Sequence, residues 1–152
     1  MRTEFTLIAT LGSAGLLAGA WAFQYFGYAP CQMCLWQRWP HAAAVLIGVA
    51  ALILPMRVLL YLGALAALTT AGIGLFHTGV ERDWWEGITS CAGAGDLTGL
   101  SVNDLLDPTR DVGPPLVKCD EVAWSLFGLS MASWNALISF GLFGVWIKAA
   151  RS

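Results

Sequence analysis

The residues of this sequence best suited to chemistry are its four cysteines, and two of them stand close together. Cys31 and Cys34 form a Cys-Gln-Met-Cys motif, whose spacing allows a strained disulfide that exchanges readily with other thiols. Cys91 and Cys119 lie 28 positions apart in a polar segment. None of the four lies inside a long apolar run, and an even number of cysteines in such segments favours disulfide chemistry, provided that the segments face an oxidising compartment.

The surroundings of Cys34 favour the thiolate, which is the reactive form of a cysteine. The motif stands directly before an expected helix start at residues 39–41, and the amino end of a helix carries partial positive charge. Arg38 adds a full positive charge four residues after Cys34. We therefore expect Cys34 to be the reactive member of the pair, with Arg38 placed to stabilise negative charge on a bound electron acceptor.

Other interpretations of the cysteines stay open at this point. A Cys-x-x-Cys motif also forms half of many zinc sites, but the spacing of Cys91 and Cys119 is unlike the short spacing of a structural zinc site. A disulfide between Cys91 and Cys119 would close a long loop, either as a structural staple or as an exposed bond that exchanges with a soluble partner. The exchange role is favoured because a loop without a core has little structure for a staple to protect.

The composition indicates an integral membrane protein. Apolar residues make up 57% of the 152 residues and charged residues only 12%, whereas soluble domains carry about a quarter charged residues. A helix needs roughly 20 apolar residues to cross the hydrocarbon core, so the length allows a handful of spans and no separate soluble domain. The net charge of −2 gives no general basic field of the kind that nucleic-acid-binding proteins use.

The apolar runs predict a single all-α membrane domain over residues 1–152, a bundle of four transmembrane helices. We expect helices at about 7–28, 40–54, 58–78 and 122–147, with outer loops at about 29–39 and 79–121. Pro55 and Arg57 predict the turn between the second and third helices, because proline ends a helix and a charged arginine stays in water. Leucines among Asp and Asn at 97–106 are consistent with a short amphipathic helix in the second outer loop.

Charge is distributed unequally between the two ends of this predicted bundle. Four spans put both termini on one side, where the charged residues are Arg2, Glu4, Arg57, Lys148 and Arg151. The opposite loops past residue 78 hold nine acidic residues against three basic ones. The positive-inside rule then makes the termini cytoplasmic and places all four cysteines in the periplasm. We therefore expect a multi-pass protein of the bacterial inner membrane.

The whole chain resembles the DsbB family, the bacterial disulfide bond formation proteins B. The motif at 31–34, followed by Gln37 and Arg38, is similar to the family's Cys-x-x-Cys followed by Glu or Gln and an invariant arginine. Segments 76–81 and 124–131 also resemble segments of the family. The resemblance covers the four spans, the cytoplasmic termini and a long second outer loop that holds the other two cysteines.

The resemblance implies a role for each cysteine in a relay of electrons. Cys91 matches the cysteine that a reduced periplasmic partner, a DsbA-like thiol oxidase, attacks, and Cys119 matches its mate, which pairs transiently with Cys31. Cys34 matches the thiolate that reduces a bound quinone, ubiquinone or menaquinone, with Arg38 beside the quinone ring. The implied activity is that of a quinone-dependent thiol oxidase, which reoxidises its partner and passes electrons to the membrane quinone pool.

His77 is the least specific of the implied site residues. The resemblance makes it a neighbour of the quinone near the outer end of the third helix, while a histidine facing lipid headgroups fits the sequence equally well. We expect no metal ligand in the site.

Two rival functions share some of these features. The vitamin K epoxide reductase family also has four core helices, a Cys-x-x-Cys motif and quinone chemistry, but it carries the motif late in the bundle. A non-enzymatic zinc- or copper-binding membrane protein would use the cysteines as ligands.

Overall fold

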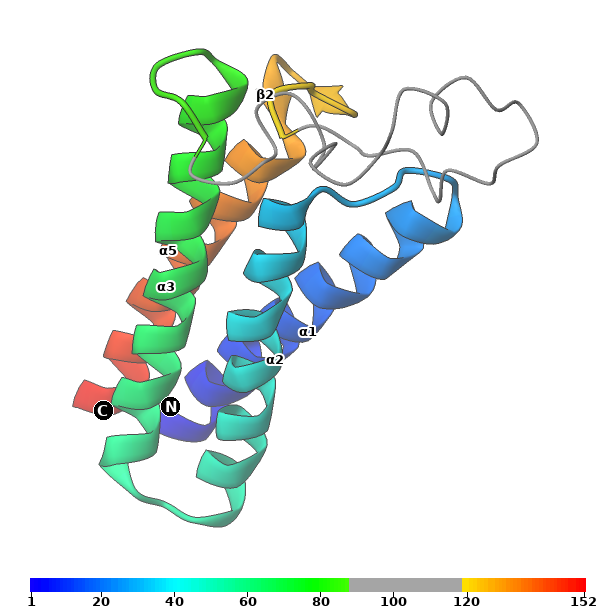
Figure 1. Ribbon diagram of the computed structural model, residues 1–152. Helices are drawn as coiled ribbons and strands as arrows, with labels where there is room; N and C mark the ends of the chain where they lie inside the picture. Colours follow the sequence, from blue (N-terminus) through cyan, green and yellow to red (C-terminus); the bar gives the residue numbers. More distant parts are fainter. Residues whose placement is uncertain (88–118) are drawn as a thin grey trace, which may run out of the picture.

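The computed structural model describes residues 1–87 and 119–152, and within these ranges the chain is almost entirely helical (Figure 1). Its helices are α1 (Arg2–Tyr25), α2 (Gln32–Ile53), α3 (Arg57–Glu81) and α5 (Met131–Arg151). A small antiparallel hairpin of β1 (Ser125–Leu126) and β2 (Leu129–Ser130) precedes α5. The amphipathic helix expected at 97–106 lies outside the described residues, as does Cys91.

The helices form an antiparallel bundle in which α1 packs on α2, α2 on α3, α3 on α5 and α5 on α1. Figure 1 shows both termini at the same end, opposite the hairpin, and α1 inclined to the other three helices. Small residues allow the close approach: Ala9, Ala64, Ala67 and Ala149 are buried around Trp146. Small side chains at helix contacts are typical of bundles whose packing does not rely on excluding water.

The outside of the bundle carries many large apolar side chains. Leu11, Leu46 and Phe140 are each more than 60% exposed. Buried polar side chains lie between the helices instead, among them Gln37 and His77. This distribution is the reverse of that in a soluble domain, and it suits a molecule whose surroundings are hydrocarbon.

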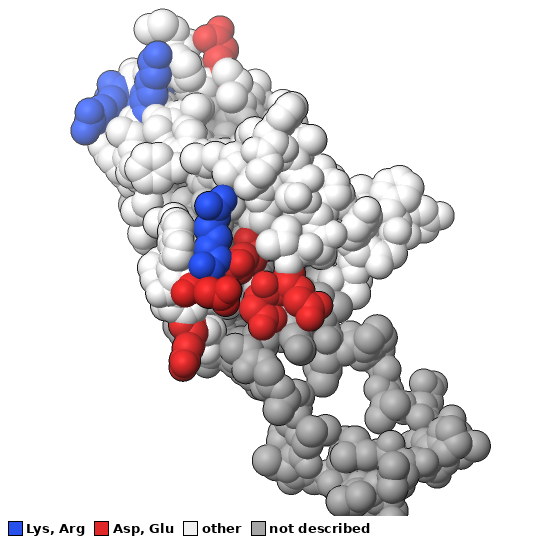
Figure 2. Space-filling model, turned by 90° about the horizontal axis from the view of Figure 1, so that it is seen from above, with Lys and Arg blue, Asp and Glu red and all other residues white. Residues whose placement is uncertain are grey.

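Two of the helices are long and apolar enough to cross a membrane as judged by length and composition, namely α1 and α3. Both differ slightly at their ends from the expected 7–28 and 58–78. The charged residues Arg57 and Glu81 stand at opposite ends of α3. In Figure 2 most of the acidic side chains in view gather in one cluster next to the grey segment with a basic side chain beside them, and one acidic side chain lies at the far end near two basic ones.

The second helix begins earlier than the sequence analysis expected. The structure starts α2 at Gln32 rather than at residue 40, so the cysteine motif forms the first turn of the helix instead of preceding it. Cys31 is the N-cap, and its Sγ accepts a hydrogen bond from the backbone N–H of Cys34 at 3.3 Å. Pro40 lies inside the helix. Proline was expected to mark the start, but the N-cap interaction at Cys31 extends the helix towards the amino end.

The last helix begins later than expected, at Met131 rather than near 122. The hairpin occupies the residues before it, and its turn has positive φ at Phe127 (53°) and Gly128 (76°), as hairpin turns of the primed types require. Ser130 then caps α5, because its Oγ accepts from the backbone N–H of Ser133 at 3.2 Å. The prediction of an all-α chain therefore misses this hairpin.

Candidate functional site

The two cysteines of the motif lie in contact at the start of α2. Cys31 Sγ donates to Cys34 Sγ across 2.8 Å, and a modest movement would bring the sulfur atoms to the disulfide bond length of about 2.05 Å. Cys31 is buried and Cys34 is half-buried. The hydrogen bond to Cys34, followed by burial, raises the pKa of the Cys31 thiol. Cys31 therefore keeps its proton, and negative charge on the pair resides on Cys34.

Cys119 lies against this pair. It is fully buried and forms an apolar cluster with Cys31, Met33 and Val80. The structure thus brings together three of the four cysteines proposed from the sequence, although Cys119 is 85 positions beyond Cys34 in the chain (119 − 34). Three cysteine side chains in one small volume provide the arrangement that thiol–disulfide exchange needs.

His77 joins the cysteine pair from α3. It is only 3% exposed, so its ring faces the interior of the bundle and not the headgroup region. Its Nε2 lies 3.6 Å from Cys31 Sγ and 3.8 Å from Glu81 Oε1, and its Nδ1 lies 3.1 Å from Gln37 Nε2. Glu81 is in turn hydrogen-bonded by the hydroxyl of Ser130, the cap of α5. Through these contacts the imidazole connects the cysteine pair with α2, α3 and the start of α5.

Arg38 reaches from α2 to α1. Its Nη1 donates to Gln24 Oε1 at 2.7 Å and its Nη2 to the carbonyl oxygen of Ala20 at 3.3 Å. Its Nε is buried and has no hydrogen-bond partner within the part of the chain that the structure describes. A buried N–H donor without a partner costs free energy, so the site is suited to a ligand that supplies an acceptor there.

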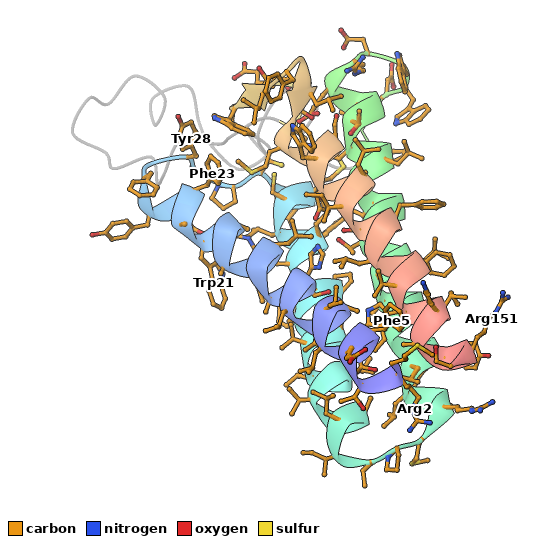
Figure 3. All side chains as sticks on the ribbon, turned by 180° about the vertical axis from the view of Figure 1, so that it is seen from behind. Arg2, Phe5, Trp21, Phe23, Tyr28 and Arg151 are labelled. Carbon is orange, nitrogen blue, oxygen red and sulfur yellow. The ribbon has the colours of Figure 1, made fainter. Side chains whose placement is uncertain are left out.

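A cavity of about 370 Å³ opens beside these residues, between the inclined α1 and the rest of the bundle. Cys34, Arg38 and His77 line it together with apolar side chains of α1 and the hairpin region. Figure 3 shows Phe23 and Tyr28 close to each other at the end of α1, and their rings pack edge to face with their centroids 5.6 Å apart. Ligand sites are typically apolar cavities of this size with a few polar groups.

A group that could hold a metal ion is part of the same site. The ligand atoms of Cys31, Cys34 and His77 all lie within 4.8 Å of one another. Two thiolates and an imidazole are ligands that zinc accepts. The metal-binding alternative therefore has a defined set of ligands, namely Cys31, Cys34 and His77.

Sequence reasoning missed several polar residues of the site. Gln37 lies between His77 and Asn135: its Nε2 is 3.1 Å from His77 Nδ1, and its Oε1 accepts a hydrogen bond from Asn135 Nδ2 at 2.7 Å. The Oδ1 of Asn135 in turn accepts a hydrogen bond from His41 Nε2 at 2.8 Å. A signal was available, because Cys34, Gln37 and His41 follow at helical spacing on one face of a largely apolar helix. The hydrogen bond from Asn135 of α5 to Gln37 of α2 links these two helices.

The fold and the site define a helical membrane protein with a redox-capable cysteine pair beside an apolar cavity. The chain belongs to the DsbB family, since the family model described as disulfide bond formation protein DsbB matches residues 2–149. This confirms the resemblance seen in the sequence.

Several relatives carry the same description. A disulfide bond formation protein B of Methylococcus capsulatus is 32% identical over 151 residues, covering 93% of this chain and 88% of that protein. One of Xanthomonas oryzae pv. oryzae is 31% identical over 156 residues, covering 98% and 89%. One of Dechloromonas aromatica is 29% identical over 140 residues, covering 87% and 82%. No solved structure matches the chain significantly.

Proposed function

We propose that this protein is a quinone-dependent thiol oxidase that reoxidises a periplasmic DsbA-like partner. The observation that carries the proposal is the position of the Cys31–Cys34 pair, which touches Cys119 on one side and lines the cavity with Arg38 on the other. The pair thus lies between a cysteine that belongs to the second outer loop and a site for a small apolar ligand. Family membership supports a role in disulfide bond formation at a membrane.

Electrons enter, in this proposal, through the loop cysteines. The thiolate of the reduced partner attacks a Cys91–Cys119 disulfide at Cys91, and the partner's second thiolate then releases the oxidised partner. Cys119 passes the electron pair on by attacking Cys31 within a Cys31–Cys34 disulfide, which leaves Cys34 as the thiolate. The burial of Cys119 against Cys31 supports this step, because exchange requires contact between the two sulfur atoms.

The residues around the cavity fit a quinone. Its ring is apolar and its carbonyl oxygens accept hydrogen bonds, which suits the apolar lining and the unpartnered Nε–H of Arg38. Cys34 also lines this cavity, so its thiolate can face the ring. A bound quinone supplies an acceptor for two electrons and two protons. Arg38 and His77 would hold it and stabilise the negative charge that develops.

A strong acceptor is needed for this reaction. DsbA is a strong oxidant with a potential of about −120 mV, and each 30 mV corresponds to about 1.4 kcal/mol for a two-electron couple, so an ordinary dithiol would not reoxidise it. A lipid-soluble quinone meets the requirement and reaches the site through the membrane. The proposal includes the topology: four spans in the bacterial inner membrane, with cytoplasmic termini and periplasmic cysteines. Two observations support this topology, namely that both termini lie at the same end of the bundle and that its outer surface is apolar.

The test is oxidation of a reduced DsbA-like protein by this protein in liposomes, followed by the absorbance of added ubiquinone-1. We expect oxidation only when quinone is present, and a loss of at least about 100-fold in the Cys34→Ser variant, because the thiolate facing the quinone is removed. Gln32→Ala is the matched control, since Gln32 is exposed within the same motif. Full activity of Cys34→Ser would refute the relay.

A further inference from the structure

A chain of buried hydrogen bonds leads from the middle of the bundle to the cysteine pair, and the backbone of α2 fixes its direction. Gln37 Nε2 lies 3.1 Å from the carbonyl oxygen of Met33. A carbonyl oxygen can only accept, so the amide nitrogen of Gln37 must face it. Gln37 Oε1 accordingly accepts from Asn135 Nδ2 at 2.7 Å. The orientation of the Gln37 amide therefore follows from two contacts on opposite sides.

This orientation determines which nitrogen of His77 carries the proton. Gln37 Nε2 is a donor, and it lies 3.1 Å from His77 Nδ1, so Nδ1 must accept. The proton of the neutral ring then lies on Nε2. The same argument applies to His41. Because Asn135 donates its Nδ2 to Gln37, its Oδ1 faces His41 and accepts a hydrogen bond from His41 Nε2 at 2.8 Å. Both histidines are expected to be Nε2–H tautomers.

The surroundings of His77 Nε2 agree with a proton at this position. Cys31 Sγ at 3.6 Å and Glu81 Oε1 at 3.8 Å are both acceptors, and a backbone group of Cys119 is hydrogen-bonded to the same histidine. The Nε2–H thus faces the sulfur of Cys31, which packs in one buried cluster with Cys119.

The same tautomer is unsuitable for a metal ligand. A metal at His77 Nε2 would require the lone pair on that atom, and a metal-bound histidine usually donates its other N–H to a carboxylate or carbonyl. Here the other nitrogen faces the N–H of Gln37, which cannot accept. The Cys31–Cys34–His77 cluster has the spacing of a metal site. The hydrogen bond at His77 Nδ1, however, runs from Gln37 to the ring, whereas a metal ligand would need the ring to donate it.

We propose that Gln37 is a positioning residue that keeps Nδ1 of His77 unprotonated and directs the ring proton to Nε2, beside Cys31 and Cys119. Gln37 thereby makes His77 a hydrogen-bond donor to the sulfur site and makes its ring less suited to binding a metal ion through Nε2. The inference deepens the proposed function and rests on it for the redox role of the pair, but the position of the proton can be measured without turnover.

The direct test is ¹⁵N NMR of the reduced, full-length protein with labelled histidine, in lipid nanodiscs without quinone at pH 7. The chain has two histidines, so the spectrum is simple, and His41→Asn assigns it. We expect bare Nδ1 and protonated Nε2 on His77 in the wild type. In Gln37→Glu the carboxylate should draw a proton to Nδ1 of His77, while the signals of His41 stay unchanged. Gln32→Glu, which adds the same charge on the exposed side of the motif, should leave both rings unchanged.

Zinc affinity of the same reduced proteins gives a second readout, measured by competition with a chromophoric chelator. Gln37→Glu should bind Zn²⁺ at least about tenfold more tightly than the wild type, because it creates a carboxylate–histidine–metal arrangement, and Gln32→Glu should not. A protonated Nδ1 on His77 in the wild type would overturn the proposal, whether or not the variant folds. So would equal zinc affinity in the wild type and a folded Gln37→Glu. Either result leaves quinone-dependent oxidation to be judged by its own assay.

Discussion

At the scale of single residues, the two cysteines of the motif are chemically unequal. Cys31 is buried and donates to Cys34, and this hydrogen bond together with burial raises the pKa of Cys31, while Cys34 is half-buried and lines the cavity. A group with a raised pKa stays protonated below that pKa, so at neutral pH Cys31 is a thiol. The negative charge and the access both favour Cys34 as the nucleophile.

This inequality predicts the order of alkylation. When the reduced protein is treated with limiting iodoacetamide at pH 7, we expect the adduct on Cys34 to exceed that on Cys31 by roughly tenfold, because only a thiolate reacts readily. Peptide mass spectrometry measures the ratio. The denatured protein is the control, since its two cysteines should react at similar rates. A native protein that is modified first at Cys31 would contradict the assignment.

At the scale of secondary structure, the contact between α3 and α5 holds the site together, because His77 and Glu81 come from α3 and Asn135 comes from α5. Gly74 allows this contact. A Cβ added at Gly74 would lie 3.1 Å from the carbonyl oxygen of Ala132, which is backbone and cannot move aside easily. The cost of forcing extra atoms into such a contact is about 1–3 kcal/mol.

Gly74→Ala is therefore expected to lower the melting temperature of the protein in detergent and to reduce the proposed oxidase activity, because it would separate α3 from α5. Gly72→Ala is the matched control, because no atom lies within 4 Å of a Cβ at that position. It should be neutral or slightly stabilising, since alanine favours a helix over glycine. Equal melting temperatures for the two variants would show that the α3–α5 contact is not close at Gly74.

At the scale of the whole molecule, the bundle has two unlike ends. Both termini and the turn before Arg57 lie at one end, and the cysteine pair and hairpin lie at the other. The labelled side chains Arg2 and Arg151 are seen at the first end in Figure 3. If the chain spans the membrane as proposed, one end faces the cytoplasm and the other the periplasm.

Labelling with a membrane-impermeant maleimide tests this orientation. In intact cells producing a variant without its four native cysteines, Glu86→Cys should be labelled and Met56→Cys should not, because only the first would lie outside. Both positions are exposed in the structure, so permeabilised cells should label both. A mass-shift gel reads the result. Labelling of Met56→Cys alone in intact cells would reverse the proposed topology.

The family, the helical class and the cysteine motif could all be predicted from the amino-acid sequence, because they depend on composition and on residues close together in the chain. Cys31, Cys34 and Arg38 share two turns of one helix, so their proximity follows from local geometry. The helix ends were harder to predict. Capping by Cys31 and Ser130, and a hairpin that displaces the start of α5, depend on local backbone choices that apolar periodicity does not reveal.

The way in which the site is completed could not be predicted from the sequence, because it depends on how the helices pack. Gln37, His77 and Asn135 come from three helices, and no local pattern states that their side chains meet in one directed chain of hydrogen bonds. The burial of Cys119 against Cys31 is equally a product of folding. The physical reason is that polar groups inside an apolar bundle must find partners wherever the packing of α2, α3 and α5 brings them together.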